Sequence, residues 1–343
     1  MSDHPTYADS GVSIGANEEA VGLIAKRIAN AGATRPEVLQ EIGGFAGAFS
    51  GRFEGLRDPV LVSATDGVGT KIQIAQTLDR HETVGFDLVA MVVDDIVCAG
   101  AEPLFLLDYI ACGRNVPERT ATIVGGIAEA CAFAGCALLG GETAEHPGVM
   151  DPDDYDLAAF GVGVVERDAM LGPGRVRAGD TLLGLRSSGL HSNGYSLVRK
   201  LILDHDLAMD TALPDGGALG EALLTPCRIH APAVLAAVRV AEVHAAAHVT
   251  QGGIAGNLAR SLPDGLGARI DASTWQPHPI FAFLKTAGGI ADEEMARVFN
   301  MGVGMIVVVA ADAAAVALET LRAGGETATV IGEVIPGDGV VIV

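Results

Sequence analysis

The sequence predicts an α/β (α+β) protein of two domains, each with its own sheet and flanking helices. The chain has 343 residues, and domains of roughly 100–200 residues are typical. Short apolar and β-branched runs alternate with helical patterns in both halves, as in layered folds. A polar, glycine-containing stretch over 166–180 separates the halves. We therefore expect a mobile glycine-containing arm over 1–16, an N-terminal domain over 17–168 and a C-terminal domain over 169–343.

The first half begins with a helix predicted over 17–29, because Asn17 can cap it and two acids follow in its first turn. Short β-branched and apolar runs predict strands over 59–65, 104–111, 137–139 and 158–165. Apolar residues at helical spacing predict a helix over 86–98. Pro117 suits the first position of a helix and opens another one over 117–133.

The second half repeats this alternation of strands and helices. The predicted strands are 181–185, 243–249, 267–271, 304–309 and 328–331, and the predicted helices are 194–203, 254–260 and 313–323. No short repeat, coiled coil or low-complexity tract interrupts the pattern. Since 49% of the residues are hydrophobic, two sizeable cores can form.

Charge and composition exclude several classes of protein. The formal net charge is −21, which repels nucleic acid and anionic membranes, although local N–H groups and cations can still bind a small anion. The start of the chain lacks the basic residues and apolar core of a signal peptide, and no apolar run reaches membrane-spanning length. The five cysteines show no zinc spacing and indicate reduced thiols. These observations together predict a cytoplasmic protein without nucleic-acid or membrane partners.

A glycine-containing turn with a lysine follows the first predicted strand, in the run Thr65–Lys71 (TDGVGTK). Glycines let backbone N–H groups approach a ligand, and Lys71 adds positive charge, so the run could bind phosphate. It is not a Walker loop, because GxxxxGK[ST] is absent. The alternative is an ordinary turn between strand and helix with Asp66 as its cap, and the chemistry alone leaves both open.

Further acids occur in apolar surroundings. Asp94 and Asp95 interrupt an apolar helix, and burying a carboxylate is costly unless it is paired or bound to metal. Glu142 follows a short strand, which suggests a Mg²⁺ site built from separate segments, because Mg²⁺ prefers carboxylate oxygens, water and phosphate. We expect a functional role for at least one of the two aspartates. The alternative is that one faces solvent and the other is hydrogen-bonded. Asp108 could ligate metal, cap a turn or form a buried pair.

Two polar loops precede helices in the second half, and glycine turns at helix N-termini are natural anion sites. The first loop, Ser187–Ser196, contains His191, and the second is His248–Gly253. For each loop the alternative is a capped turn in which the histidine only hydrogen-bonds to backbone. Two such loops in one domain favour ligand binding.

Taken in order, these stretches resemble the phosphoribosylformylglycinamidine cyclo-ligases, also called aminoimidazole ribonucleotide synthetases. The resemblance rests on DGVGTK, DLVAMVVDDIVCAGAEPLFLLDYIA, LLGGETAEHPG, SSGLHSNGYSLVRK and FNMGVGM, and runs from about Tyr7 to near the C-terminus. The wider superfamily includes selenophosphate synthase and thiamine monophosphate kinase. The resemblance implies an N-terminal small mixed sheet that forms a barrel across a homodimer, and a C-terminal sheet flanked by helices. ATP would lie between the domains and near the dimer interface.

The resemblance also implies an activity. It is the ATP-dependent ring closure of formylglycinamidine ribonucleotide to aminoimidazole ribonucleotide in purine synthesis. ADP and phosphate would be released, and the reaction would pass through an iminophosphate. ATP and Mg²⁺ are the implied cofactors, and a role for K⁺ stays open.

The family pattern assigns roles residue by residue. The implied Mg²⁺ ligands are Asp66, Asp95 and Glu142. The implied contacts to the ATP phosphates are Thr65, Gly67, Gly69, Thr70, Lys71, Gly141 and Thr143. The implied substrate contacts are Ser192, Asn193, His248, Thr250, Gly252 and Gly253. His191 and Lys71 are the expected catalytic residues: His191 to move a proton, since imidazole titrates near neutral pH, and Lys71 to stabilise the transferring group. The segment 11–17 resembles one that folds over nucleotide.

Three positions depart from the family pattern, namely Asp94 for a common Asn, His146 for a common Met and Gln251 for a third glycine. Rival members of the superfamily fit less well. Selenophosphate synthase needs a reactive cysteine near its N-terminus, whereas the first cysteine here is Cys98. The hydrogenase-maturation relative needs a C-terminal cysteine, whereas this sequence ends in Val-Val-Ile-Val. A small-molecule kinase and a non-catalytic nucleotide-binding regulator stay open, and substrate-dependent phosphate release would separate them from a cyclo-ligase.

Overall fold

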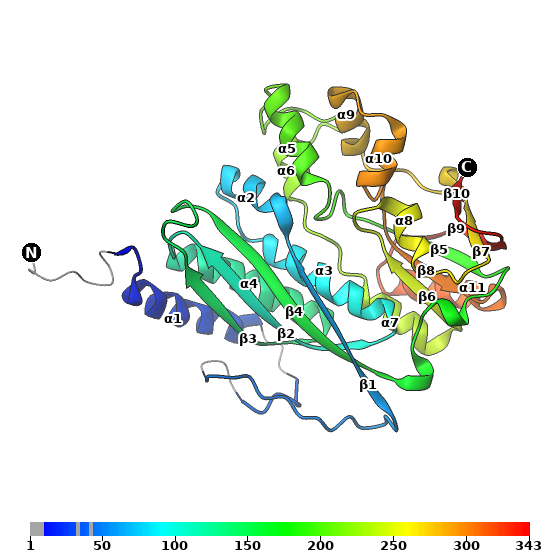
Figure 1. Ribbon diagram of the computed structural model, residues 1–343, viewed down its shortest axis with the longest axis horizontal. Helices are drawn as coiled ribbons and strands as arrows, with labels where there is room; N and C mark the ends of the chain where they lie inside the picture. The colour runs from blue at the N-terminus through cyan, green and yellow to red at the C-terminus, as the bar shows by residue number, and fades with distance from the viewer. Residues whose placement is uncertain (1–9, 32–34, 41–43) are drawn as a thin grey trace, which may run out of the picture.

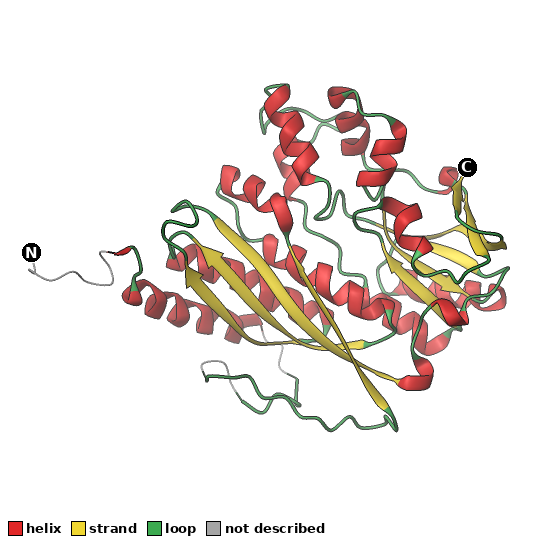
Figure 2. Ribbon diagram, in the orientation of Figure 1, coloured by secondary structure: helices red, strands yellow, loops and turns green. Residues whose placement is uncertain are grey.

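The computed structural model of the chain describes residues 10–31, 35–40 and 44–343. Two sheets flanked by helices form its two halves (Figures 1 and 2). The four-stranded sheet has the order β1-β4-β2-β3, and the six-stranded sheet has the order β10-β7-β9-β5-β8-β6. The expected α/β architecture with two sheets is confirmed, whereas the barrel across two chains stays a prediction. Within the described ranges, no helix is both long and apolar enough to cross a membrane.

The N-terminal half places its helices on one face of the four-stranded sheet. Its elements are α1 (Ile14–Ala31), β1 (Pro59–Gly67), η2 (Gly69–Lys71), α2 (Ile72–Leu78), α3 (Val84–Cys98), β2 (Glu102–Cys112), α4 (Pro117–Ala134), β3 (Ala137–Glu145) and β4 (Tyr155–Glu166). β1 and β2 pair antiparallel to β4, and β3 runs parallel to β2. α3 packs on the sheet, α4 lies beside α3, and α1 packs on α4 (Figure 1). Alternate side chains therefore face the helices; in β2 and β4 most of these are buried, in β1 they are half-buried, and the others form an outer face.

The C-terminal half covers both faces of its sheet. Its elements are β5 (Thr181–Arg186), α5 (Tyr195–Asp204), α6 (Leu219–Leu224), α7 (Ala231–Val240), β6 (Val243–His248), α8 (Gly253–Ala259), β7 (Leu266–Ile270), η5 (Ala272–Thr274), α9 (Pro279–Gly288), α10 (Asp292–Val298), β8 (Val303–Val309), η6 (Ala311–Ala313), α11 (Ala314–Ala323), β9 (Ala328–Pro336) and β10 (Val340–Ile342). α7 and α11 pack together on one face, and α8 and Trp275 pack on the other. Between the halves lie only the short turns η3 (Arg167–Ala169) and η4 (Pro173–Arg175).

Helix α3 belongs to the cores of both halves. It contacts β1 and β4 of the first sheet, and also β6 and α7 of the second half. One hydrophobic cluster consequently runs from the first sheet through α3 to the second sheet, where it includes Met305 and Val307. This explains why α3 is apolar on nearly all sides in sequence.

Two boundaries differ from the predictions in ways that matter for function. α1 begins at Ile14 and not at Asn17, because the Ser13 hydroxyl accepts a hydrogen bond from the backbone N–H of Ala16 (3.2 Å). The predicted arm over 1–16 is therefore wrong at its end, and residues 1–9 lie outside the described residues. β3 continues to Glu145, so GGETAE is part of a strand and not a loop after it.

Asp108 is buried on the helix-facing side of β2, where it faces Gly141 of β3. A Cβ atom at Gly141 would lie 2.2 Å from Asp108 Oδ1, so only glycine fits beside this carboxyl group. Burial raises the pKa of Asp108 to about 7.

Asp108→Asn should remove a pH dependence of stability. The unfolded-state pKa is about 3.9, so the protonated carboxyl stabilises the fold at low pH, and this contribution is lost as the pH rises towards about 7. Between about pH 5.5 and about pH 7.5, the unfolding free energy of the native chain should fall by about 2 kcal/mol relative to the variant. Urea unfolding of both proteins measures this difference. Parallel curves would contradict the buried titration.

Candidate active site

A cleft of about 470 Å³ lies between the two halves of the chain. It brings together the turn after β1, the beginning of β4 and the two polar loops of the C-terminal half. Its lining residues are Asp66, Gly67, Val68, Gly69, Met91, Asp156, Leu157, Ala158, Ser192, Asn193, Thr250 and Gln251. Segments far apart in the sequence therefore meet around one space.

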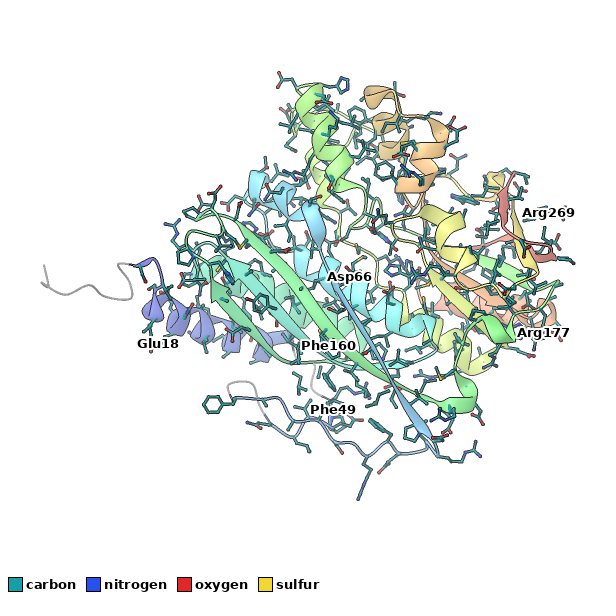
Figure 3. The ribbon with its side chains drawn as sticks, viewed as in Figure 1. Glu18, Phe49, Asp66, Phe160, Arg177 and Arg269 are labelled. Carbon is teal, nitrogen blue, oxygen red and sulfur yellow. The ribbon has the colours of Figure 1, made fainter. Side chains whose placement is uncertain are left out.

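Two carboxylates and a histidine lie at the edge of this cleft. Asp66 ends β1 (Figure 3), and Asp95 lies on α3, one helical turn after the cleft residue Met91. Burial raises the pKa of Asp66, and the nearby Asp95 carboxylate raises it further, while the N–H of Gly67 opposes both. His248 Nδ1 lies 2.9 Å from Asp95 Oδ1.

This carboxylate pair fits a divalent cation. Burial alone would lower the pKa of His248, but the hydrogen bond to Asp95 and the negative charges of Asp94, Asp95 and Asp66 together outweigh burial and raise the pKa. The charges around Asp66 and Asp95 therefore favour a positive group between them, and Mg²⁺ prefers such oxygens. Among the described residues, however, no three His, Cys, Asp or Glu side chains come together as a metal site.

Glu142 is the predicted ligand that does not join this pair. In the strand register, Asp66 pairs with Ala159, Ala159 with Asp108, and Asp108 with Gly141. Glu142 is the next residue, so it points to the opposite face of the sheet from Asp66, three strands and about 14 Å away. Within a single chain Glu142 therefore does not lie with Asp66 and Asp95, and the Mg²⁺ site of all three acids stays a prediction.

Asp94 has a structural role. Its side chain is fully buried, and Oδ1 accepts hydrogen bonds from the backbone N–H groups of His230 (3.0 Å) and Ala231 (2.8 Å). Ala231 begins α7, whose first N–H groups have no partner within the helix. Asp94 thus caps α7 from another helix, while its neighbour Asp95 faces the cleft side.

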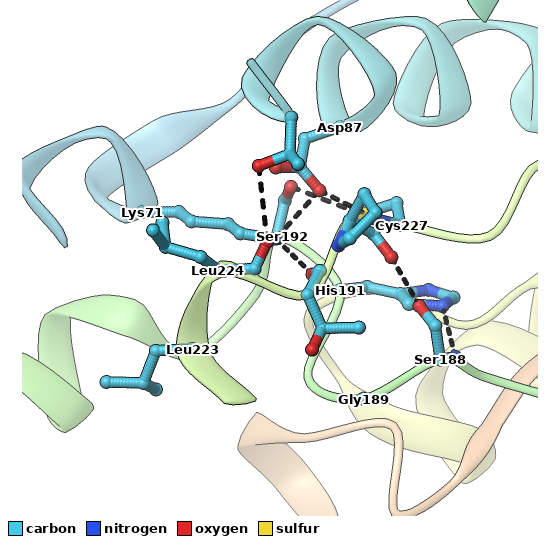
Figure 4. Close-up of polar contacts among 12 residues, drawn as sticks. Lys71, Asp87, Ser188, Gly189, His191, Ser192, Leu223, Leu224 and Cys227 are labelled. Carbon is cyan, nitrogen blue, oxygen red and sulfur yellow. Dashed lines mark hydrogen bonds and ion pairs between the residues drawn. The ribbon is translucent and has the colours of Figure 1, made fainter. Parts of the chain in front are cut away.

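Lys71 is not exposed to the cleft. Its side chain is completely buried, and Nζ donates to Asp87 Oδ1 (2.8 Å) and to the carbonyl oxygen of Thr225 (2.6 Å) (Figure 4). Asp87 Oδ1 also accepts from the backbone N–H of Cys227 (2.7 Å). Burial alone would lower the pKa of Lys71, but the interactions of Lys71 with Asp87, Tyr195 and Cys227 together outweigh burial and keep the pKa above its usual value. Lys71 therefore joins the two halves of the chain, and this placement does not support a role on the transferring phosphate.

His191 is likewise buried, with its side chain among backbone groups (Figure 4). Nε2 accepts hydrogen bonds from the backbone N–H groups of Ser188 (3.1 Å) and Arg228 (3.4 Å), so the ring proton belongs on Nδ1. Burial and the nearby His230 lower the pKa of His191 well below its usual value. The histidine therefore shapes its loop as a neutral acceptor, which does not support the predicted proton transfer.

Two buried asparagines fix the polar loops, and sequence reasoning missed both. Asn300 Nδ2 donates to the carbonyl oxygen of Gly189 (2.9 Å), and its Oδ1 accepts from Ser187 Oγ (3.1 Å). Asn257 Nδ2 donates to the carbonyl oxygens of Thr250 (3.2 Å), Gln251 (3.2 Å) and Gly253 (2.9 Å). Asn300 lies in FNMGVGM, a motif that contributed to the family resemblance but did not indicate what Asn300 does.

Glycines in these loops are required by close contacts. A Cβ at Gly194 would lie 2.2 Å from Phe299, and one at Gly253 would lie 1.8 Å from the carbonyl oxygen of Ala296. A Cβ at Gly304 in β8 would lie 2.6 Å from the ring of His191. The glycines at these positions therefore let the loops pack tightly.

The other residues predicted to bind phosphate or substrate lie at different distances from the cleft. Thr65 lies on the outer face of β1 and donates its hydroxyl to the carbonyl oxygen of Ala159 (2.9 Å). Thr70 Oγ1 lies 3.1 Å from Ser196 Oγ of α5 and so links the halves. Thr143 lies in β3, next to Glu142 and away from the cleft lining. Gly252, with φ +102°, precedes α8.

Comparison with known proteins identifies the family. The N-terminal domain model of AIR synthase related proteins matches residues 55–165, and the C-terminal domain model matches 177–343. Phosphoribosylformylglycinamidine cyclo-ligase of Geobacillus kaustophilus (strain HTA426) is 50% identical over 336 residues, which is 97% of this chain and 96% of the relative. That of Shouchella clausii (strain KSM-K16) is 48% identical over 98% of this chain and 97% of the relative. The chain belongs to the phosphoribosylformylglycinamidine cyclo-ligase family. It is an enzyme of this family.

Solved structures of more distant proteins share the fold. Thiamine-monophosphate kinase from Stenotrophomonas maltophilia K279a has a TM-score of 0.67 at 21% identity, covering 93% of this chain and 95% of that one. The hydrogenase maturation protein HypE in complex with ATP has a TM-score of 0.64 at 17% identity, covering 96% of this chain and 91% of that one. These likenesses concern the fold alone.

The three departures from the cyclo-ligase pattern are accommodated by the structure. Asp94 caps α7 and is not among the residues that line the cleft. Gln251 lines the cleft and is not among the residues with positive φ, so a glycine is not needed there. His146 Nε2 lies 3.1 Å from the hydroxyl oxygen of Tyr109.

Lys71→Met should destabilise the cyclo-ligase chain, because it leaves Asp87 buried without its cation. Removing one partner of a buried pair costs about 3–5 kcal/mol, and adding Asp87→Asn should recover part of this loss. Urea unfolding of the two variants and the native chain measures both effects. Full stability of Lys71→Met together with loss of ATP binding would instead indicate a phosphate ligand.

Proposed function

We propose that the chain catalyses the ATP-dependent ring closure of formylglycinamidine ribonucleotide to aminoimidazole ribonucleotide in purine synthesis. The observation that carries the proposal is the cleft: Asp66 lines it beside two polar loops of the other half of the chain, and Asp95 lies near Asp66, one helical turn after the lining residue Met91. The identity of about 50% to curated cyclo-ligases along nearly the whole chain supports the same substrate.

The formyl oxygen of the substrate is an amide oxygen and therefore a very poor leaving group, which the reaction has to convert into a better one. The γ-phosphoryl group of ATP moves to the formyl oxygen of the substrate, ADP leaves, and an iminophosphate forms. The ribose-bearing amidine nitrogen then attacks the formyl carbon, the C–O bond to phosphate breaks, and the nitrogen loses a proton. Positioning and charge neutralisation are the main tasks of the protein in such a reaction.

Each task has a candidate group in the cleft. Asp66 and Asp95 would hold Mg²⁺, which would neutralise phosphate charge, and His248 keeps Asp95 in position. Backbone N–H groups of the turn Gly67–Gly69 would approach the phosphates. The glycine-containing loop after β6 and the side chains of Ser192 and Asn193 would hold the substrate.

The direct test is incubation of the purified chain with formylglycinamidine ribonucleotide, ATP and Mg²⁺. We expect the aminoimidazole product and one phosphate for each product molecule. A stable phosphorylated product would indicate a kinase, and ATP binding without substrate-dependent phosphate release would indicate a regulator.

Asp95→Asn should lower kcat by roughly 100-fold or more, because it removes a carboxylate from the proposed cation site. Asp94→Asn is the matched control, since it removes the same charge at the adjacent position and keeps an acceptor for α7. It should retain most activity. Steady-state kinetics with varied Mg²⁺ measures both variants, and near-native turnover of Asp95→Asn would remove Asp95 from the site.

We also propose that the chain acts as a homodimer through the outer face of its four-stranded sheet. Leu61, Leu107, Tyr109 and Phe160 are exposed on that face, which lies opposite α3 (Figure 3). Large exposed apolar patches mark interaction surfaces. Glu142 shares this face with Tyr109, so it would lie at the interface.

Replacing both Leu107 and Phe160 with Asp should convert a dimer to a monomer, since two buried charges would oppose association. Both side chains are exposed in the single chain, so the fold should remain. Leu203→Asp, at an exposed apolar position on α5, is the control and should leave the mass unchanged. Analytical ultracentrifugation gives the mass. A native chain that sediments as a monomer would overturn the proposal.

A further inference from the structure

A second, smaller pocket of about 170 Å³ lies in the C-terminal half and shares no lining residue with the cleft. It lies where β5 ends, β8 begins and the segment after η5 crosses the sheet. Its lining residues are Gly184, Arg186, Thr274, Trp275, Gln276, Gly302, Val303, Thr327 and Thr329. The proposed ring closure uses none of them.

Arg186 is the charged group of this pocket, and part of it lacks a partner. Its Nε atom is buried and makes no hydrogen bond within the described residues. The buried Lys71 and the guanidinium of Arg228, by contrast, have the acids Asp87 and Glu326. A buried donor without a partner is costly and calls for an explanation, such as a ligand.

Among the residues that the structure describes, Arg186 forms no salt bridge with an acid. His278 lies nearby and donates from Nε2 to the carbonyl oxygen of Ser187 (2.7 Å). Burial lowers the pKa of His278, and the charge of Arg186 lowers it further. The pocket therefore presents a local positive field on a chain whose net charge is −21.

An indole ring, a valine and two glycines form an apolar part of the pocket. The indole N–H of Trp275 donates to the carbonyl oxygen of Met301 (3.0 Å), which fixes the ring. A Cβ at Gly302 would lie 3.5 Å from Cδ1 of Trp275, so the ring lies against bare backbone. Val303 and the second glycine, Gly184, complete the apolar surface.

We propose that this pocket binds a small planar organic carboxylate. The carboxylate would accept hydrogen bonds from the guanidinium of Arg186, whose fork matches two oxygens. The planar body would lie against the indole of Trp275, and the hydroxyls of Thr327 and Thr329 lie at the same pocket. The site is separate from the proposed catalytic cleft and would exist whether or not the chain closes the imidazole ring.

Trp275 makes the test specific, because it is the only tryptophan in the sequence. Benzoate is titrated into the full-length chain, and Trp275 fluorescence is followed. We expect a saturable change, with the neutral isostere benzamide binding at least about tenfold more weakly. Absence of a saturable benzoate signal would overturn the proposal and leave water as the partner of Arg186.

Arg186→Gln should weaken benzoate at least about tenfold. Arg269→Gln is the matched control, since it removes the same charge from an exposed position on β7 of the same sheet. It should bind benzoate like the native chain. Far-UV circular dichroism checks that both variants fold. Equal benzoate affinity of Arg186→Gln and the native chain would show that another group binds the carboxylate.

Discussion

The buried ion pair of Lys71 and Asp87 fixes the relation between the two halves of the molecule. Lys71 follows the turn that lines the cleft, Asp87 lies on α3, and both hydrogen-bond to backbone groups of 225–227. Burying two charges is costly unless their geometry is well satisfied, so few other arrangements of the halves would be tolerated. The cleft has its shape because its two walls are held together at this point.

Helix α3 shows which of these structural roles can be predicted from the sequence. Asp87 and Asp94 are seven residues apart, which is nearly two helical turns, so they share the face that meets the second half. Asp95 is rotated by about 100° from Asp94 and joins the face of Met91. The sequence predicted that acids in an apolar helix have defined roles, and helical spacing could have separated the two structural acids from the exposed one.

Prediction from the sequence was limited where a residue's position depends on strand pairing or on contacts between segments that are distant in the sequence. The sheets and most of the longer helices were predicted from hydrophobic pattern, because that pattern is local. The position of Glu142 depends on the pairing of β2 with β3, which no local pattern reveals. Lys71 and His191 carry side chains typical of catalysis, yet their burial was set by segments more than 30 residues away along the chain, at 225–228. The helices α2, α6, α7, α9 and α10 were not predicted, and length alone does not explain this, because the seven-residue α8 was predicted.

The shared position of α3 has a consequence for how the chain can be divided. A fragment ending in the segment between the sheets would leave bare the apolar side of α3 that normally meets β6 and α7. The complementary fragment would lack the carboxylate that caps α7. Because each fragment would lose contacts that its core needs, we expect the two sheets to fold as one cooperative unit.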